Sequence, residues 1–285
     1  MSNPYPSSPC VVVGIDGSRA AEHAALWAVD EAVDRDVPVL LLYAVDANNN
    51  DPDAAAAEIA TADNAIRNVI TKIESTGKPV KLESEVVHSG AAAALLEASR
   101  SATVLCVGST GFKHAVRGRI GSTASTLATA AHCPVAIVSR TATPPGRGLV
   151  LAVVDASPAS DTVLDRAVAE ARLRDGALRV LTRRQQNPAT ACGPAADDRR
   201  VQAEIEHRLA HRRRNHPDLD IESVPSHGGL LNYLEQTDRS ATPVQLVVVD
   251  PVQPGPVDTL LSPQGRAALD AARCTLLICD RRWWL

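Results

Sequence analysis

The stretch that decides the fold lies near the start of the chain and reads VVVGIDGS, Val11–Ser18. It opens with an apolar run that holds one glycine, and Asp16 and two small residues follow. An alanine-rich segment with apolar residues at helical spacing comes next. A short uninterrupted apolar run is typical of a strand in a parallel sheet that helices cover on both faces. The stretch therefore predicts the first strand and the first helix of an α/β fold.

The same pattern returns in the second half of the chain. Residues 149–157 read LVLAVVDAS, again an apolar run that ends in an aspartate and small residues. Two later apolar runs also recur at nearly the same spacing, 104–107 with 246–249 and 134–138 with 275–279. The sequence therefore predicts a tandem repeat. We expect an N-terminal domain at 1–140, a C-terminal domain at 149–285 and a Pro/Gly-rich linker at 141–148.

Strands and helices alternate inside the N-terminal repeat. Apolar runs predict strands at 11–15, 37–45, 104–107 and 134–138, and alternating apolar residues predict a half-buried strand at 80–86. Helical periodicity predicts helices at 20–35, 53–76, 91–100 and 122–131. Right-handed crossovers then predict two tandem doubly wound domains, each with a five-stranded parallel sheet. Ligands of such sheets bind beyond the carboxyl ends of the strands, where the strand order reverses. Functional residues are therefore expected directly after Ile15, Ala44 and Val107.

Composition argues against several classes of protein. The 285 residues carry a formal net charge of −4 and only 2% aromatic residues, which disfavours a nucleic-acid-binding surface. No window approaches the roughly 18 consecutive apolar residues of a membrane-spanning helix, and the N-terminus lacks the pattern of a secretory signal. Six cysteines without a C-x-x-C pair indicate reduced thiols. We expect a cytoplasmic protein that contacts neither nucleic acid nor membrane.

A glycine-rich segment with the pattern G-x2-G-x9-G-S/T follows the predicted fourth strand. Its key residues are Gly108, Ser109 and Gly111, and then Gly121, Ser122 and Thr123, which open the next helix. Glycine lets a phosphate oxygen approach the backbone, and free N–H groups at a helix start favour an anion. Cationic side chains lie between the glycines, at Lys113, His114, Arg117 and Arg119. The pattern predicts a nucleotide phosphate site, and the alternative is an ordinary glycine-rich loop with a serine N-cap.

With this loop, and with Asp16 after the first strand, the chain resembles the universal stress protein family in its tandem two-domain form. The resemblance covers nearly the whole chain and implies an adenine-nucleotide α-hydrolase-like fold that binds ATP, with Mg²⁺ left open. It implies that Asp16 contacts the ribose and the adenine end, that Gly14 lies behind the base, and that the backbone of Ala44 lines the adenine pocket. It assigns the phosphates to the glycine loop, that is, to Gly108, Ser109, Gly111, Gly121, Ser122 and Thr123. The alternative for Asp16 is the N-cap of the following helix.

The C-terminal repeat departs from the family pattern at this loop. Three substitutions fall where the N-terminal repeat has its glycines, namely Asp250, Gln253 and Ser262-Pro263. Prolines in this segment remove backbone N–H donors, and the Asp250 carboxylate would repel a phosphate. We therefore expect a degenerate copy that is kept for packing or partner contact, with Asp155 as a helix cap. A different ligand for this half is the alternative.

Catalytic signals are weak. The sequence contains no G-x-S-x-G, H-E-x-x-H or G-x4-G-K-S/T motif. We expect no enzyme, with weak ATP hydrolysis left open, and assign no catalytic residue and no metal site. The basic run Arg212–Arg214 suggests RNA, but a solvated helix end beside acidic neighbours is favoured. Trp283 and Trp284 are expected to pack on a neighbouring domain or subunit.

Three functions compete at this point. The first is a stress-response regulator that binds adenine nucleotide in its N-terminal domain. The second is a ligand-free interaction module that acts through domain pairing, and the third, which the missing motifs disfavour, is an enzyme of the wider fold family. We expect the fifth strands, 134–138 and 275–279, to pair within the chain as a pseudo-dimer, because an uncovered apolar edge would aggregate. A homodimer stays open.

Overall fold

The fold comes from a computed structural model that describes residues 8–45, 52–111, 121–141, 148–183, 194–224, 229–237, 242–251 and 255–280. In the N-terminal half, strands and helices alternate in the predicted order, with ends that differ by a few residues from the expected ones. The elements are β1 (Val11–Ile15), α1 (Arg19–Asp34), β2 (Val39–Val45), α2 (Pro52–Glu74), β3 (Leu82–His88), α3 (Ala91–Ala98), β4 (Val104–Gly108), α4 (Ser122–Ala130) and β5 (Val135–Val138).

The C-terminal half has the same alternation with one extra helix. Its elements are β6 (Leu149–Val154), α5 (Ala159–Leu173), β7 (Ala177–Thr182), α6 (Pro194–Asn215), β8 (Ile221–Val224), α7 (Gly229–Thr237), β9 (Val244–Val249), α8 (Pro256–Leu261), α9 (Pro263–Ala271) and β10 (Thr275–Ile278). The extra helix is α8, which begins with Pro256, at a position where proline loses no helical hydrogen bond. Residues 142–147, within the expected linker, lie outside the described residues, so the domain bounds stay a prediction.

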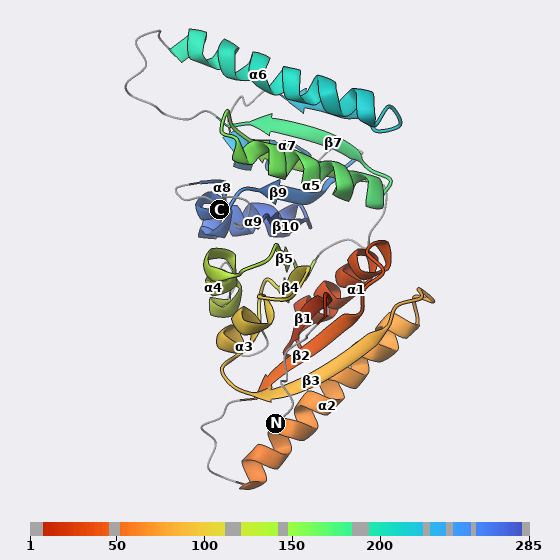
Figure 1. Ribbon diagram of the computed structural model, residues 1–285. Helices are drawn as coiled ribbons and strands as arrows, with labels where there is room; N and C mark the ends of the chain where they lie inside the picture. The colour runs from red at the N-terminus through yellow and green to blue at the C-terminus, as the bar shows by residue number, and fades with distance from the viewer. Residues whose placement is uncertain are drawn as a thin grey trace.

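The ten strands of the described residues form one continuous sheet (Figure 1). Their order is β3-β2-β1-β4-β5-β10-β9-β6-β7-β8, so each half contributes five neighbouring strands with the same internal order. Within each half every strand pair is parallel. The predicted pair of doubly wound five-stranded parallel sheets is therefore confirmed.

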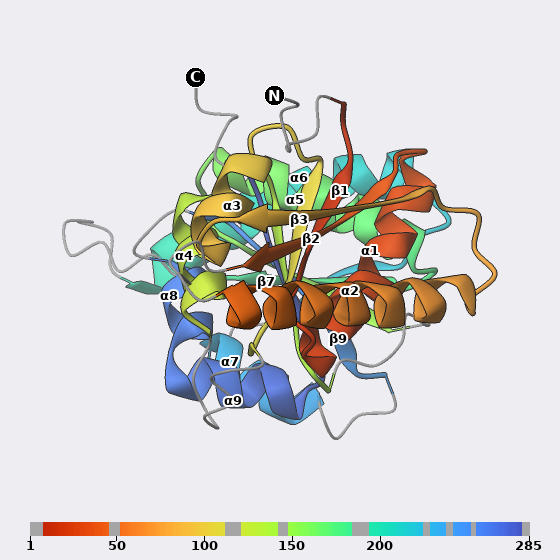
Figure 2. The ribbon, with the colours of Figure 1, turned by 90° about the horizontal axis from the view of Figure 1, so that it is seen from below.

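Helices cover both faces of the sheet (Figures 1 and 2). Helices α1, α2, α5 and α6 pack on one face, against inward residues such as Val13. Helices α3, α4, α7, α8 and α9 pack on the other, against residues such as Val12. Successive side chains of a strand point to opposite faces, and both faces are dry at central strands such as β1, β4 and β6, which explains their uninterrupted apolar runs. No helix in the described part of the chain combines the length and the apolar character needed to cross a bilayer.

The two halves join through their fifth strands. β5 and β10 are antiparallel neighbours, with Ile137 opposite Leu276 and Ala136 opposite Leu277. All residues of both strands are buried. The predicted pairing of the fifth strands is confirmed, and each strand covers an apolar edge that the other half would otherwise expose.

A buried cluster of charges forms a second contact between the halves, at the crossing of α1 and α5. Glu31 of α1 receives the Arg166 and Arg174 guanidinium groups from α5, each with an N–O distance of 2.9 Å. Glu170 of α5 pairs with the same two arginines, with an Arg166 Nε–Oε1 distance of 2.7 Å. The Arg174 guanidinium also lies 4.8 Å from the centre of the Trp27 ring. Two glutamates at equivalent places in the repeat thus share one set of arginines.

The two glutamates differ in their affinity for a proton. Burial alone would raise the pKa of Glu31, but the charges of Arg166, Arg174 and Arg35 outweigh burial and lower the pKa to about 2. Burial, together with the negative charge of Glu31, raises the pKa of Glu170 to about 7. Glu31 is therefore the permanent anion of the cluster, whereas Glu170 holds its proton up to neutral pH.

This difference predicts unequal effects of two matched substitutions. At pH 6, Glu31→Gln should lower the free energy of unfolding by about 3–5 kcal/mol, because it removes a buried anion from its cations. Glu170→Gln should cost clearly less, because it imitates the protonated form. Chemical denaturation of the two variants and the parent at pH 6 measures both effects, and equal losses would contradict the assignment.

The same glutamate predicts a pH dependence. The folded pKa of Glu170, about 7, lies above its ordinary value of 4.5, so its contribution to stability is complete below pH 4.5 and is lost as pH rises through 7. Glu31 has the opposite sign, since its contribution is present above pH 4.5 and is lost as pH falls through 2. Glu170→Gln should therefore flatten the decline in unfolding free energy between pH 5 and pH 8, and an unchanged decline would contradict this account.

Candidate functional site

The predicted site lies where β1 and β4 end side by side. These two strands are parallel neighbours, but the chain leaves β1 for α1 on one face of the sheet and leaves β4 toward α4 on the other. Ligands of doubly wound sheets bind at such a reversal, beyond the carboxyl ends of the strands. The segments that follow β1 and β4 at this place are residues 16–18 and 109–111.

The structure brings four of the predicted site residues together. A Cβ atom added to Gly111 would lie 2.8 Å from Oδ2 of Asp16, so the carboxylate lies directly against this glycine. The Gly121 N–H donates to the Ser109 carbonyl at 3.1 Å, which places the start of α4 over the end of β4. Ser109 is itself anchored by its N–H, which donates to the Val138 carbonyl of β5 at 2.8 Å. These residues are far apart in the sequence and form one surface.

Asp16 is not a helix cap. The N-cap of α1 is Ser18, whose Oγ accepts from the Ala21 N–H at 3.1 Å. Oδ1 of Asp16 accepts from the Ser18 N–H at 3.0 Å and closes a turn in which Gly17 has a φ of +79°. The alternative interpretation of Asp16 as an N-cap is therefore wrong. The turn instead orients its carboxyl group across the loop toward Gly111.

Among the described residues, the start of α4 has no side-chain cap. Its N-cap is Gly121, which has no side chain to accept from the first turn, and the helix begins at Ser122 as predicted. The alternative of a serine N-cap is wrong at this position. Ser122 is exposed and Thr123 is half-buried. Uncapped N–H groups at the positive end of a helix dipole are suited to an anion.

Ser109 contributes a further polar group. The residue is buried, and its Oγ has no hydrogen-bond partner among the described residues. A buried hydroxyl without a partner costs about 1–3 kcal/mol, so its presence beside an uncapped helix start indicates a polar ligand.

Two of the predicted glycines have packing roles that spacing alone could not reveal. A Cβ atom at Gly108 would lie 2.7 Å from backbone atoms of Ala20 and Ala21, so this glycine lets α1 approach β4. A Cβ atom at Gly14 would lie 2.9 Å from the Leu95 side chain of α3. Ala44 lies near the end of β2 and packs on the same face as α3. The contacts of Gly14, Gly108 and Ala44 with a nucleotide stay predictions.

The equivalent place in the C-terminal half is filled by the protein itself. Ile15 pairs with Tyr43 and Val154 pairs with Thr182, so Arg183 occupies the register position that Ala44 has in the N-terminal half. Its guanidinium lies 3.1 Å from Oδ2 of Asp155, the counterpart of Asp16. An ion pair thus lies at the place where the N-terminal half has Asp16 and Ala44. Sequence comparison of the two second strands could have shown this replacement.

Asp155 also has a different local role from the one expected. Oδ1 of Asp155 accepts from the Ser157 N–H at 2.8 Å and from the Ser160 hydroxyl at 3.2 Å, whereas the N-cap of α5 is Pro158. The expected helix-cap role is therefore wrong. Asp155 holds its turn and the Arg183 guanidinium instead.

The helix that corresponds to α4 is already capped. Ser262 is the N-cap of α9, and its Oγ accepts from the Gly265 N–H at 3.1 Å. Pro263 at the first helical position has no N–H to offer. The two halves thus differ at the start of this helix. The N-cap of α4 is a glycine without a side chain, whereas the first turn of α9 is capped by Ser262. Gln253 lies outside the described residues.

The sequence is similar to known proteins over nearly its full length. The sequence model of the universal stress protein family matches residues 10–139. Over 282 residues the chain is 42% identical to "Universal stress protein Rv2028c" of Mycobacterium tuberculosis, covering 96% of this chain and 97% of that protein. The chain belongs to the universal stress protein family.

Solved universal stress proteins share the fold. One from Archaeoglobus fulgidus aligns over 98% of both chains with a TM-score of 0.66 at 15% identity. A shorter one from the same organism, solved in complex with dAMP, aligns over 45% of this chain and 94% of its own, with 21% identity and a TM-score of 0.36. The dAMP is bound to that protein.

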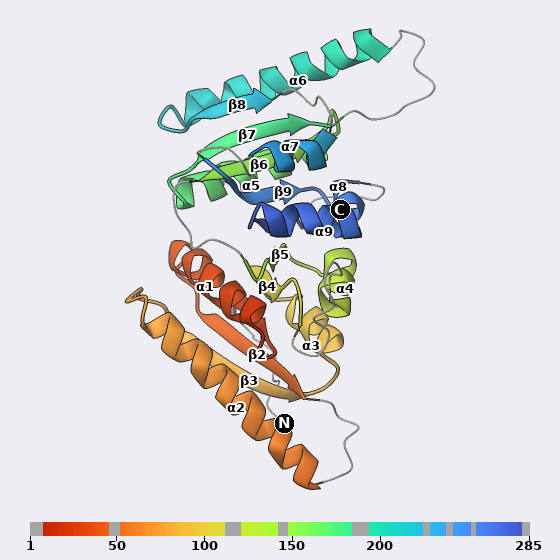
Figure 3. The same cartoon turned by 180° about the vertical axis from the view of Figure 1, so that it is seen from behind.

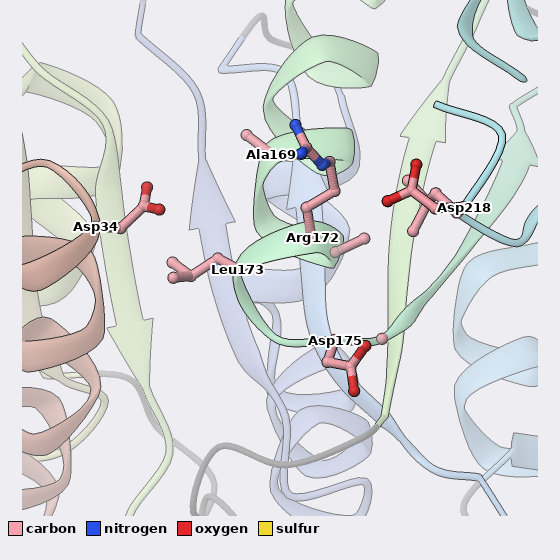
Figure 4. Close-up of a pocket in the computed structure, with 9 residues that line it drawn as sticks. Asp34, Ala169, Arg172, Leu173, Asp175 and Asp218 are labelled. Atoms are coloured by element: carbon pink, nitrogen blue, oxygen red, sulfur yellow. The ribbon is translucent and has the colours of Figure 1, made fainter. Parts of the chain in front are cut away.

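A pocket elsewhere on this universal stress protein does not suit a phosphate (Figure 4). Its volume is about 400 Å³, and it lies where α5 ends and β7 begins, at the amino ends of the strands. Asp34, Asp175 and Asp218 line it, with Arg172 as the one cation among its lining residues. The excess of carboxylates would repel an anion.

The remaining sequence candidates have structural roles or lie outside the described residues. Arg212 is buried and pairs with Asp161 and Asp165 at 3.1 and 2.7 Å, so the expected solvated helix end is wrong for this residue. Five free cysteines are buried, and burial raises the pKa of Cys274 to about 12, as expected of core thiols. The cationic residues between the glycines and the two C-terminal tryptophans lie outside the described residues, as does Cys192. In the described part of the chain, no three His, Cys, Asp or Glu side chains group as metal ligands.

The glycines allow a test that separates packing from ligand binding. Gly108→Ala should lower the free energy of unfolding by about 1–3 kcal/mol, because its Cβ would meet the backbone of α1. Gly121→Ala is the control, since its Cβ would lie no closer than 3.7 Å to a neighbouring atom, and it should cost at most about 1 kcal/mol. Thermal and chemical denaturation measure both, and a Gly108→Ala variant as stable as the parent would contradict the packing role.

Proposed function

We propose that this universal stress protein is a stress-response regulator that binds an adenine nucleotide, ATP above all, in its N-terminal half. The observation that carries the proposal is the difference between α4 and α9. Helix α4 starts without a cap beside the buried, unpartnered Ser109 hydroxyl, whereas α9 is closed by Ser262. A phosphate at the start of α4 would satisfy the groups that α9 satisfies internally.

The groups around the proposed site match the parts of a nucleotide. Backbone N–H groups at Gly111 and at the start of α4 suit phosphate oxygens, and the hydroxyls of Ser122 and Thr123 extend this set. Asp16 is the carboxylate beside the loop and suits ribose hydroxyls. The preference for adenine rests on family membership, which assigns the base to the neighbourhood of Gly14 and Ala44.

We further propose binding without efficient turnover, in the cytoplasm. The chain lacks the serine-hydrolase, zinc-protease and P-loop motifs named above, and the groups at the site are those that hold an anion rather than those that activate a nucleophile. Regulation would then depend on whether the nucleotide is bound. A ligand-free interaction module is the alternative, and the nucleotide titration below decides between them.

One nucleotide per chain is the expected stoichiometry. Isothermal titration of the full chain with ATP, with and without Mg²⁺, should give a value near one, because Arg183 and Ser262 close the equivalent site in the C-terminal half. A stoichiometry near two would contradict the assignment of the site to one half. No binding of any adenine nucleotide would favour the interaction module.

Gly121→Val should abolish ATP binding without unfolding the protein. Gly121 has φ −58° and ψ 146°, which valine adopts readily, and no atom lies closer than 3.7 Å to its added Cβ. The branched side chain would occupy the space above Gly111 where phosphate oxygens must approach. Loss of several charge-assisted N–H contacts, about 1.5–3 kcal/mol each, should weaken binding well over tenfold.

The matched control is Ser262→Val at the equivalent position of α9. It should cost about 1 kcal/mol of stability, because the helix loses its cap, and should leave ATP affinity unchanged. Circular dichroism and titration of both variants complete the comparison. A Gly121→Val variant that binds ATP as tightly as the parent would show that the loop is not the phosphate site.

A further inference from the structure

Arg266 belongs to the C-terminal half but reaches the loop of the N-terminal half. The residue lies on α9, which faces β5 and the start of α4 across the junction of the halves (Figure 3). It is 3% exposed, and its Nη1 donates to the Ser109 carbonyl at 2.8 Å. A buried arginine is rare unless its charge has a defined partner.

The orientation of Arg266 is fixed by groups from both halves. Its Nε donates to Oδ2 of Asp270 at 2.7 Å, and Oδ1 of Asp270 accepts from the Ser139 hydroxyl at 2.7 Å. The Thr141 hydroxyl donates to the Asp270 carbonyl at 3.0 Å. Ser139 and Thr141 directly follow β5, so the network runs from the N-terminal half through Asp270 and Arg266 and back to Ser109.

The Ser109 carbonyl is the point where this network meets the proposed site. It accepts from two donors, the Arg266 guanidinium and the Gly121 N–H. The bond from Gly121 sets the distance between the end of β4 and the start of α4. The bond from Arg266 holds the Ser109 carbonyl in the orientation that the Gly121 bond needs. A guanidinium can hold Asp270 and Ser109 at once because its donors form a rigid fork.

We propose that Arg266 is a positioning residue for the nucleotide site, so that the half without a site of its own holds the other half's phosphate loop in its binding geometry. This inference rests on the proposed function. A binding site needs its groups within about 0.5 Å of the productive arrangement, and a carbonyl that loses one of two buried donors no longer fixes the loop. Linkage then requires the reverse effect, so bound nucleotide stabilises the contact between the halves.

Titration of full-chain variants with ATP tests the proposal. Arg266→Met should bind ATP about tenfold to a hundredfold more weakly, the range that one buried charge-assisted hydrogen bond spans. Arg266→Lys keeps the charge and the packing, but its ammonium group lacks the fork, so it should lose affinity by a smaller factor. Arg212→Met removes a buried, ion-paired arginine of the same half far from the loop and should leave affinity unchanged.

Hydrogen exchange without nucleotide separates positioning from a general loss of structure. In Arg266→Met, peptides that contain Gly121–Ala124 should exchange faster than in the parent, while β5 and β10 keep their protection. Faster exchange throughout β5 and β10 would indicate a structural role and overturn the proposal. If the methionine variant does not fold, the same two measurements on Arg266→Lys decide.

The remaining outcomes are distinguishable. A parent that binds ATP and a folded Arg266 variant that binds it equally well would overturn this inference and leave the proposed function intact. A parent that binds no adenine nucleotide would overturn the proposed function and this inference with it.

Discussion

The antiparallel contact between β5 and β10 is the constraint on which the rest of the structure depends. Four residues on each side join two five-stranded sheets into one. Because the contact fixes the halves relative to each other, it also brings α1 against α5 and α9 against the end of β4. The buried Glu31–Arg174 pair and the Arg266–Ser109 bond both depend on it, since each joins residues of different halves.

The two repeats have the same strand order but differ at residues of the proposed ligand site. Apolar strand residues are equivalent in the two halves, whereas Ala44 is replaced by Arg183 and Gly121 by Ser262. Each replacement supplies internally what a ligand would supply, a charge opposite Asp155 in one case and a helix cap in the other. The C-terminal half is therefore stable without a ligand at this place, and the N-terminal half leaves an uncapped helix start and a buried hydroxyl. Substitutions at the junction are constrained differently, because a buried charge of one half needs an oppositely charged partner in the other half.

The sequence was sufficient for the sheet, and it singled out Asp16, Gly111 and Gly121, of which the structure brings Asp16 against Gly111. Apolar runs such as Val11–Ile15 predict strands because both faces of the central strands are dry. It was not sufficient for the charge cluster, since Glu31 lies among alanines of a helix and its partner Arg174 is distant in the chain. The packing of α1 on Gly108 could not be predicted either, because the spacing of the glycines does not reveal it. From the sequence, Asp16 and Ser18 are both candidates for the N-cap of α1, and only the backbone geometry of the turn shows that Ser18 is the cap.

The contacts of the C-terminal half argue that it supports the fold of the N-terminal half. The C-terminal half contributes β10, without which β5 would be an exposed apolar edge, and Arg266, without which the Ser109 carbonyl would lose a donor. Neither contribution requires the C-terminal half to bind anything. Both contributions require the C-terminal half to stay folded. The Asp155–Arg183 ion pair and the Ser262 helix cap are compatible with this role, because they stabilise the domain without a ligand. The β5–β10 contact thus places the C-terminal half where its residues reach the end of β4 in the N-terminal half.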